Sequence, residues 1–580
     1  MKKRILSFIA VLIALLAVGV NNLQAQEDIR REVTLYNPFK PSLNKASKLN
    51  FMPLLSDTVI TAPEFKYSIN ARPFMPEYEL RTISAARLQP DPLPKLYKGF
   101  LNLGFGNYFS PLAELSISSD RSRNSNAGVY LSHESSFGKL KINDNIKVYA
   151  GYMDNSASLF WNRFFRRTAV SADIDFNHIR RYAYGGDTIM LAPAEIDKDS
   201  LRIEYIHPRA GINIYSIRLD SSKLYFDVGF NYDLLYQNSI FYQHSAALEG
   251  EFGYDFDIFY AGLDMAYKLF TIPNIEDKFR HLVYLNPTIS KRSTNWNFRL
   301  GLKLIADARY YNDPSAPLEY KTRLFFYPDL RFQFSIMPGI LSMYVGLDGE
   351  YSNNNAAEMI YANPFVITHN TNGLVEPSDD LYTILPTDTK LRIKGGFTGH
   401  ATLNTRYNLN ISYSMFDDMV FFINDTYQGR GFSPVYDNGE LLDIRAGFST
   451  QLNKRISLSG KGGFYNYVME SVEKPWHKPS WDGEMILEYN LRDKILGKAG
   501  IYALSERYGR FGPMPYSGST DYEVAELPMY FSLNLGLEYR YTKILSFWAR
   551  INNIALNRYY EWNFYPAQRF LFMAGFTYSL

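Results

Sequence analysis

The chain has 580 residues, a formal net charge of +2 and no cysteine. A charge so close to zero creates no field that would attract nucleic acid, and the lack of cysteine excludes disulfides, thiolate catalysis and Cys-zinc sites. Aromatic residues make up 16% of the chain, and they favour strands and membrane interfaces. The mean hydropathy of -0.24 is too low for a bundle of membrane helices. It is compatible with a barrel, in which polar lumen-facing residues dilute the apolar ones.

The first 25 residues have the pattern of a secretory signal. Lys2, Lys3 and Arg4 precede an apolar run from Phe8 to Val20, and Ala25 stands before Gln26. The run is too short to span a bilayer as a helix, and no later apolar stretch is longer. We therefore expect an exported protein. A place in a membrane would require a closed barrel, which pairs all of its backbone polar groups.

Residues 26–96 differ from the rest of the chain in their proline content. Nine prolines fall here: Pro38, Pro41, Pro53, Pro63, Pro73, Pro76, Pro90, Pro92 and Pro94. Proline at this density interrupts helices and sheet ladders, so the sequence predicts an extended periplasmic or lumenal arm, of which the part from about Pro63 to Pro94 would thread the barrel lumen. A short β-prone stretch lies near its start and consists of Glu32, Val33, Thr34, Leu35 and Tyr36.

From Tyr97 onward, apolar and polar residues alternate in segment after segment. Successive side chains of a strand point to opposite faces, so each segment has one apolar and one polar face. We count 22 segments: 97–107, 111–120, 126–136, 156–165, 167–183, 204–217, 223–236, 240–254, 257–269, 278–290, 294–307, 320–333, 339–352, 389–401, 407–423, 440–452, 455–469, 481–491, 495–507, 529–541, 544–557 and 567–580. They predict an all-β fold, a transmembrane antiparallel β-barrel of about 22 strands over residues 97–580.

The connections between these segments alternate in length. Every second one is a short turn, as at 165–166, 453–454 and 542–543, whereas most of the others are longer, up to residues 353–387. Outer-membrane barrels have short periplasmic turns and longer extracellular loops. The asymmetry therefore favours the cell outer membrane, although two expected outer connections, 107–110 and 237–239, are short.

The C-terminal residues resemble the closing signature of TonB-dependent outer-membrane receptors. Ile551-Asn552-Asn553-Ile554-Ala555-Leu556-Asn557-Arg558-Tyr559-Tyr560-Glu561-Trp562 is followed by Tyr565-Pro566-Ala567-Gln568-Arg569 and an aromatic last strand. In the family the pattern is roughly I-N-N-L-x-N-K-x-Y-Y, then Y-P-x-P-G-R. The residues from Leu93 to Gly99, leading into Gly104 to Tyr108, look like a plug-less branch of the Bacteroidota type.

The resemblance implies a barrel in outer-membrane lipid that takes up a nutrient or chelate. It also makes Glu32, Val33, Thr34, Leu35 and Tyr36 a TonB-box-like segment, which would add as a strand to a TonB-like periplasmic protein. The chain departs from the family because residues 26–96 are too few for the globular plug that such receptors carry. A second function therefore stays open, a non-transporting barrel that acts as scaffold or assembly partner for another envelope subunit.

Few residues suggest chemistry. The eight histidines lack metal-ligand spacing and no glycine-rich phosphate loop occurs, so we expect no cofactor, no metal site and no nucleic-acid partner. His133-Glu134-Ser135 suggests a serine hydrolase, but neighbouring strand residues face opposite sides and a triad is defined by geometry. We expect no enzyme.

The longest connection, residues 353–387, is the remaining candidate site. A loop of this length is usually functional or disordered. We expect a helical turn at 356–361, and Tyr361, Phe365 and Tyr382 are candidate ligand-binding aromatics. The alternative interpretation is that the loop simply caps the barrel mouth.

Overall fold

The computed structural model describes residues 97–580 apart from 120–121, 123, 142–146, 187–197, 218–222, 238–240, 273–275, 312–318, 367–383, 425–429 and 513–521. The expected signal sequence, the proline-rich arm, the segment from Glu32 to Tyr36 and Tyr382 lie outside the described residues. In the part of the chain that is described, no helix has the length and apolar character needed to cross a lipid bilayer.

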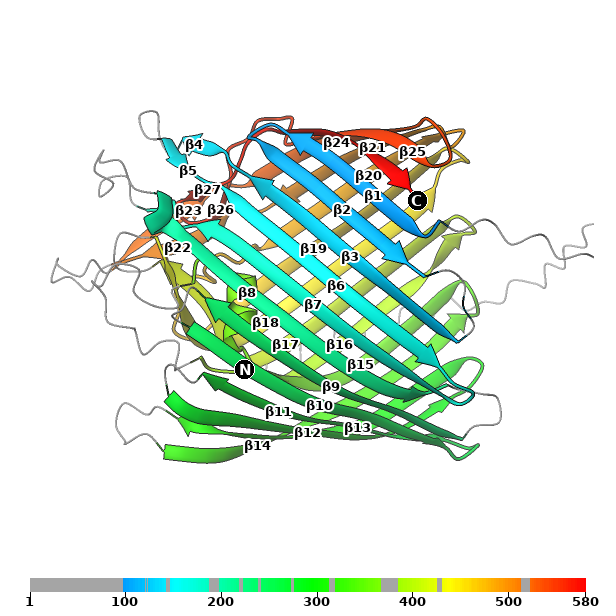
Figure 1. Cartoon of the computed structure of the whole chain (residues 1–580). Helices are drawn as coiled ribbons and strands as arrows, with labels where there is room; N and C mark the ends of the chain where they lie inside the picture. Colours follow the sequence, from blue (N-terminus) through cyan, green and yellow to red (C-terminus); the bar gives the residue numbers. More distant parts are fainter. Residues whose placement is uncertain are drawn as a thin grey trace, which may run out of the picture. The chain divides into compact units, whose positions relative to one another are not determined.

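One antiparallel sheet closes on itself and forms a barrel (Figure 1). Its first strand pairs with its last, from Phe100 opposite Ser579 to Gly106 opposite Met573, so the ring has no free edge. Two of the 24 strands described in this sheet, β22 and β23, branch off and touch the ring through a single parallel bridge between Asn424 and Phe511. The other 22 form the ring, which confirms the predicted fold and strand number.

Each barrel strand pairs with its neighbours in chain order. The strands are β1 (Gly99–Gly106), β2 (Ser110–Ser118), β3 (Ser125–Ser136), β6 (Tyr152–Phe164), β7 (Thr168–Tyr182), β8 (Arg202–Ser216), β9 (Leu224–Gln237), β10 (Phe241–Asp255), β11 (Tyr260–Ile272), β12 (Glu276–Arg292), β13 (Trp296–Tyr311), β14 (Glu319–Met337), β15 (Leu341–Ser352), β16 (Thr387–Thr402), β17 (Thr405–Asn424), β18 (Phe432–Gln451), β19 (Ile456–Met469), β20 (Trp481–Leu491), β21 (Ile495–Leu504), β24 (Tyr530–Arg540), β25 (Leu545–Asn552) and β28 (Leu571–Ser579).

The remaining elements lie in the long connections. They are β4 (Lys139–Lys141), β5 (Lys147–Tyr149), the 3-10 helix η1 (Lys198–Leu201), α2 (Ala356–Ala362), β22 (Arg507–Phe511), β23 (Glu523–Leu527), β26 (Tyr560–Trp562) and β27 (Tyr565–Pro566). Every one of these connections follows a strand that runs in the same direction, so all of them meet at one end of the barrel (Figure 1). We call it the long-loop end and the opposite one the short-turn end.

The alternation of the sequence becomes the two faces of the barrel wall. On β9, Leu224 and Phe230 are exposed on the outside, whereas Asp227 and Asn231 line a cavity in the lumen. An apolar exterior and a polar interior are the reverse of a soluble protein and are expected of a barrel in lipid. The predicted assignment of the two faces on this strand is confirmed.

The short-turn end is built by local hydrogen bonds. Between β20 and β21, Arg492 and Asp493 have φ angles of 53° and 56°, a left-handed conformation that reverses the chain tightly. The Asn490 side chain stabilises this turn, because its Oδ1 accepts from the Asp493 N–H at 2.8 Å.

Strand ends near the long loops differ from the prediction. β18 begins at Phe432 instead of residue 440, and its pairing with β17 extends to Asn424. Phe422 and Phe432 are buried against loops there instead of facing lipid, so the period of two is lost although the ladder continues. β25 ends at Asn552 rather than at residue 557, because Asn553 takes a φ of 52° and turns the chain.

Candidate functional site at the long-loop end

The connection after β15 bends inward at its base. Arg280 holds this base, since its Nη1 donates to the Asn353 carbonyl at 3.2 Å while Nε and Nη2 bind both oxygens of the buried Asp307 at 2.9 and 3.0 Å. Asn354 has a φ of 50° and donates to the Leu385 carbonyl at 2.9 Å. The two ends of the loop are thereby tied together and to the barrel wall.

α2 follows at once and confirms the predicted helical turn. Asn355 caps it, because its side chain accepts from the Glu358 N–H at 2.9 Å. The Ala356 N–H donates to Gln243 Oε1 on β10 at 3.0 Å. The first turn of the helix is therefore bound to the lumenal side of the wall.

Beyond α2 the chain joins the opposite wall. The Phe432 N–H donates to the Phe365 carbonyl at 3.0 Å, and Val366 pairs with Phe432 in a parallel bridge. The Tyr205 hydroxyl on β8 donates to the Pro364 carbonyl at 3.1 Å. The segment after α2 is thus bonded to β8 on one side and to β18 on the other.

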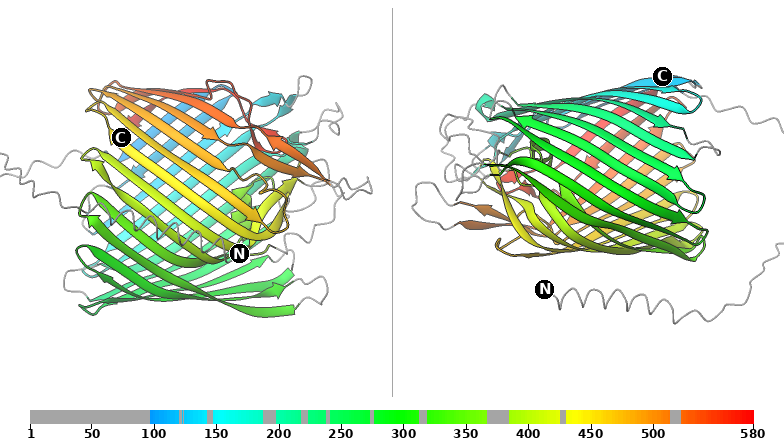
Figure 2. Two further views of the ribbon diagram at one scale, coloured as in Figure 1. Left: turned by 180° about the vertical axis from the view of Figure 1, so that it is seen from behind. Right: turned by 90° about the horizontal axis from the view of Figure 1, so that it is seen from below.

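These contacts build one buried apolar cluster, which we call the mouth cluster. It contains Ile203, Tyr205, Leu235, Ala356, Ala357, Met359, Ile360, Phe365, Val366, Phe422, Phe432 and Tyr565. Its members come from β8, β9, α2, the segment after α2, β17, β18 and β27. Both views of Figure 2 show the short strands of the long-loop end gathered at one end of the barrel. Between β8 and β17 lie eight ring strands by one path and twelve by the other, so the cluster bridges walls that are nearly opposite.

The C-terminal signature supplies the last member of the mouth cluster. Asn553 shapes the turn after β25, where its Nδ2 donates to the Asn557 carbonyl at 2.9 Å. The β26–β27 hairpin then brings Tyr565 over Phe365, with ring centroids 4.0 Å apart. The Tyr565 hydroxyl donates to the Arg430 carbonyl, so this buried polar atom is satisfied.

A buried histidine lies beside the mouth cluster, in the connection between β19 and β20. His477 Nδ1–H donates to the Phe422 carbonyl at 3.0 Å, and Nε2 accepts from the Asn563 N–H at 3.3 Å. The pKa of His477 is lowered to about 3, mainly by burial and to a smaller extent by the positive charges of Arg507 and Lys478, while the hydrogen bond to Phe422 opposes this shift. A neutral His477 therefore links the β26–β27 hairpin to the barrel wall at neutral pH.

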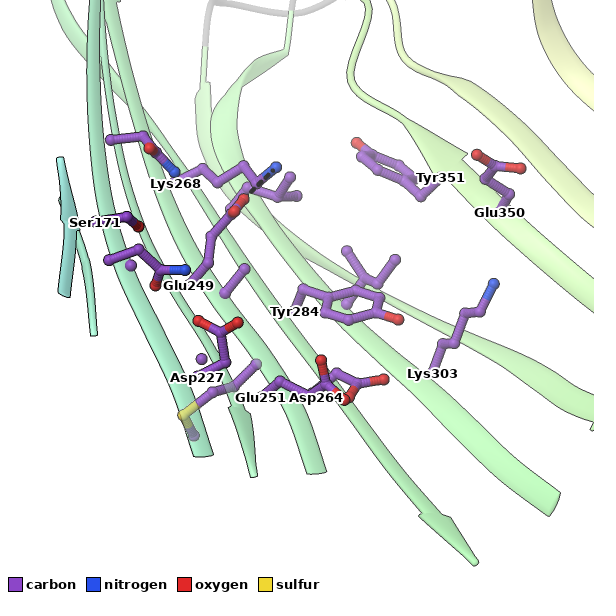
Figure 3. Close-up of a pocket in the computed structure, with 18 of the residues that line it drawn as sticks. Ser171, Asp227, Glu249, Glu251, Asp264, Lys268, Tyr284, Lys303, Glu350 and Tyr351 are labelled. Atoms are coloured by element: carbon purple, nitrogen blue, oxygen red, sulfur yellow. Dashed lines mark ion pairs between the residues drawn. The ribbon is translucent and has the colours of Figure 1, made fainter. Parts of the chain in front are cut away.

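A cavity of about 870 Å³ opens in the lumen on the strands that hold this loop (Figure 3). Its wall carries six carboxylates and three cations: Asp173, Asp227, Glu249, Glu251, Asp264, Glu350, Lys268, Lys303 and Arg392. The cations already have partners. Lys268 binds Glu249 at 3.0 Å, Lys303 donates to the Gly349 carbonyl at 2.8 Å and Arg392 binds Asp348 at 2.8 Å. Three of the carboxylates are paired as well, Glu249 with Lys268, Glu350 with Arg392 at 3.1 Å and Asp264 with Arg299 at 3.0 Å. The lining still holds six carboxylates against three cations, so the cavity is polar and has an excess of negative charge.

The predicted loop aromatics take different positions. Phe365 is buried in the mouth cluster, so in this structure it packs against other loops. Tyr361 is 48% exposed and its hydroxyl bonds to His207 Nδ1 at 2.9 Å. Tyr382 lies outside the described residues, and a ligand role for these aromatics stays a prediction.

Sequence reasoning missed that the loop crosses the lumen. The Asn363-Pro364-Phe365 run after a helical turn was the available signal, because an apolar residue at a turn after a short helix needs a partner. What it could not provide was the partner, which comes from the chain some 200 residues later, at Tyr565.

The histidine and serine of the His133-Glu134-Ser135 motif lie closer together than the sequence suggested. His133 and Ser135 are two residues apart on β3, so they share a face, and Ser135 Oγ lies 2.9 Å from His133 Nε2. Only the intervening Glu134 points to the other side. Among the described residues, no three His, Cys, Asp or Glu side chains gather in a way that would hold a metal ion.

Comparison with known proteins places the fold. The sequence matches no protein-family profile and no curated protein. The structure is similar to the FrpB iron transporter from Neisseria meningitidis, with a TM-score of 0.62, 10% identity and coverage of 84% of this chain and 82% of that one. It is also similar to the ferric-catecholate import receptor Fiu from E. coli K12, with a TM-score of 0.58, 9% identity and coverage of 84% and 82%.

A third solved structure gives the same result. The siderophore receptor PiuA from Acinetobacter baumannii has a TM-score of 0.58 and 11% identity, with coverage of 83% of this chain and 82% of that one. At such identities the likeness shows the fold. The chain has a 22-stranded barrel of the kind found in TonB-dependent receptors, as its C-terminal signature indicated, and these neighbours are named as transport receptors rather than enzymes.

Proposed function

We propose that the protein is an outer-membrane receptor that takes up a polar nutrient or chelate. The observation that carries this proposal is the mouth cluster, which bridges the barrel above a polar cavity of about 870 Å³. The barrel fold, shared over 84% of the chain with FrpB, supports it. In this proposal the long-loop end faces the outside of the cell and the short-turn end faces the periplasm.

The charge of the lumen suggests the class of solute. Six carboxylates against three cations leave an excess of negative charge on the cavity wall, even though Glu249, Asp264 and Glu350 are ion-paired. The cavity therefore favours solutes with positive charge or several hydrogen-bond donors. An anionic solute would meet a repulsive wall unless a metal ion or another cation neutralised it.

Export and energy coupling belong to the same proposal. Residues 1–25 would direct export, residues 26–96 would form the periplasmic arm, and residues 97–580 the barrel. The segment from Glu32 to Tyr36 would add as a strand to a TonB-like periplasmic protein. Such a contact would pull on the arm.

Removal of α2 tests the proposal. A variant in which residues 356–366 are replaced by a short glycine-serine linker loses the bridge while the wall stays intact. In planar bilayers we expect a larger single-channel conductance than that of the wild type. Its reversal potential in a KCl gradient should show cation preference, and Asp227→Asn with Glu251→Gln should reduce that preference.

Two results would contradict the proposal. An unchanged conductance after the deletion would mean that the mouth cluster does not close the barrel, and anion preference would reject the solute class. If the folded barrel instead co-purifies with an envelope subunit and stays closed in every variant, the scaffold function is the better one.

A further inference from the structure

A chain of hydrogen bonds crosses four strands on the outer face of the barrel, near the long-loop end. Ser135 Oγ lies 2.9 Å from His133 Nε2, and His133 Nδ1 lies 2.6 Å from Asn155 Oδ1 on β6. Asn155 Nδ2 lies 2.9 Å from His178 Nδ1 on β7, and His178 Nε2 lies 2.5 Å from Glu204 Oε1 on β8. The strand register pairs His133, Asn155 and His178 side by side, so the chain is set by the sheet itself.

The carboxylate at the end of this chain fixes the direction of the bond to His178, and the orientation of the Asn155 amide gives the direction of the others. Glu204 is held ionised by Arg180, whose Nη2 donates to it at 2.7 Å, so His178 Nε2 must carry a proton. In the amide orientation of the structure, Asn155 Nδ2 donates to His178 Nδ1, and Asn155 Oδ1 accepts from His133 Nδ1–H. His133 Nε2 is left as a base facing the Ser135 hydroxyl. This is the tautomer that nucleophile activation requires.

The position of the chain suggests what it meets. Leu131 on β3 and Phe176 on β7 stand two residues before His133 and His178, on the same face and about 7 Å closer to the short-turn end. Both side chains are exposed. Leu159 and Ile174 continue this apolar surface. Exposed apolar side chains therefore border the hydrogen-bond chain on its short-turn side, where a lipid acyl chain would lie along the barrel wall.

Aromatic side chains flank the serine on the other side. The register places Ser135 opposite Met153, and Phe137 follows two residues later on the same side of the strand end. The exposed rings of Phe105, Phe109 and Phe137 form a contiguous group, with centroids 5.2 and 5.8 Å apart. Such a group offers an apolar surface for an acyl chain.

We propose that Ser135 and His133 are catalytic residues of an esterase site on the outer face of the barrel, that Asn155 is their positioning residue, and that the substrate is an acyl ester of a membrane lipid. Ser135 Oγ attacks the ester carbonyl carbon while its proton passes to His133 Nε2. The carbon–oxygen bond to the alcohol breaks, and His133 returns the proton to the leaving alcohol. Water then attacks the acyl-serine by the same route, which releases the fatty acid and restores Ser135.

Access is part of the proposal. Ser135 has no exposed surface in this structure, so the ester must displace neighbouring side chains to reach it. An enzyme of this kind acts only where a lipid interface is present. Activity is therefore expected in mixed micelles and not on a dissolved short-chain ester below its solubility limit.

A fluorophosphonate probe tests the site directly, because it reacts only with an activated serine. The folded full-length barrel in phospholipid–detergent micelles is incubated with the probe, and the labelled peptide is mapped by mass spectrometry. We expect labelling of Ser135, and release of fatty acid from the micellar phospholipid. Ser135→Ala and His133→Gln should each lower the release at least about 100-fold, the usual loss when a base or nucleophile is removed.

The neighbouring serine is the matched control. Ser136 is equally buried, but it faces the lumen, where its Oγ accepts from Gln568 Nε2 at 2.9 Å. Ser136→Ala should keep both labelling and hydrolysis. Asn155→Asp keeps an acceptor for His133 and should retain most of the activity, whereas Asn155→Leu should lose it.

The outcomes separate cleanly. The proposal is overturned if the folded wild-type barrel takes up no probe and releases no fatty acid, or if the probe maps to another serine. The hydrogen bonds from Ser135 to Glu204 would then only satisfy polar side chains on the outer face of the barrel. If Asn155→Leu is as active as Asn155→Asp, Asn155 does not position His133. None of these results depends on whether the barrel transports a solute.

Discussion

His477 gives the mouth cluster a pH dependence that can be worked out from one side chain. Its pKa is about 3 in the folded cluster, whereas an opened loop would restore the ordinary value near 6.5. The open form therefore binds a proton first, so the stability of the closed form is complete above pH 6.5 and is lost as the pH falls toward 3. At pH 4.5 the loss amounts to about 3 kcal/mol.

Hydrogen exchange can measure this effect. We expect the amides of His477 and Asn563 to lose protection between pH 6.5 and 4.5, beyond the intrinsic change in exchange rate. The variant His477→Gln keeps an amide donor and acceptor but cannot titrate, so its protection should not depend on pH. A wild type with constant protection over this range would contradict the assignment.

The two faces of β10 can be tested at adjacent residues. Leu248 is exposed on the outer face between Phe230 and Tyr267, whereas Ala247 faces the lumen between Asn231 and Lys268, which both line the cavity. Leu248→Arg places a charge against lipid, at a cost of about 2–4 kcal/mol near the midplane. Ala247→Arg enters a wall with excess carboxylates. Only Leu248→Arg should reduce the heat-modifiable folded band on gels, and equal damage by both would mean that the faces are assigned wrongly.

At the scale of elements, the strands could be predicted and the loops could not. A strand such as β9 alternates because each residue faces either lipid or lumen, and that constraint is local. The β22–β23 hairpin, the early start of β18 and the fold of residues 353–366 depend on partners far along the chain. The sequence marks Phe365 as a candidate ligand-binding aromatic, but its packing partner Tyr565 is brought to it only when the barrel closes.

The loop that carries α2 can be locked in place. Val366 and Phe432 are bridge partners, so cysteines at both positions are within reach of a disulfide, and the chain has no other cysteine. A disulfide stabilises a closed form by about 2–4 kcal/mol. In planar bilayers under an applied voltage, channel openings of the oxidised double variant should therefore become at least about 30-fold rarer. Reduction by dithiothreitol should restore them.

Single-cysteine variants at residues 366 and 432 serve as controls for this lock. Neither variant can form an intramolecular disulfide, so oxidation should leave the frequency of channel openings unchanged. Openings that persist in the oxidised double variant would show that the loop need not leave β18 when the barrel opens.

At the scale of the whole molecule, the sequence was sufficient for the barrel and insufficient for the candidate sites. Twenty-two alternating segments with unequal connections leave little choice of architecture. The mouth cluster joins strands from nearly opposite walls, which no local pattern can indicate. His133 and Ser135 show the intermediate case. Their spacing of two residues places them on one face, a signal that the expectation of no enzyme passed over. Asn155, His178 and Glu204 could be aligned with them only once the register between four strands was known.

One buried tryptophan spans the seam where the first and last strands pair, and this yields a prediction for the whole barrel. Trp548 on β25 reaches past the last strand, and its Nε1–H donates to Asn102 Oδ1 on β1 at 2.7 Å. It fits over two glycines, since a Cβ at Gly104 or Gly575 would lie 2.5 Å from its ring. Trp548→Ala leaves a cavity at the seam and should cost about 3–5 kcal/mol, so the folded band should convert to the unfolded one at a lower temperature.

Gly104→Val, which pushes against the same ring, should act in the same direction. Trp161→Ala, which removes a tryptophan that is 45% exposed on the outer face of β6, should shift the conversion much less. If all three variants convert together, the first and last strands hold the barrel closed through their backbone ladder alone.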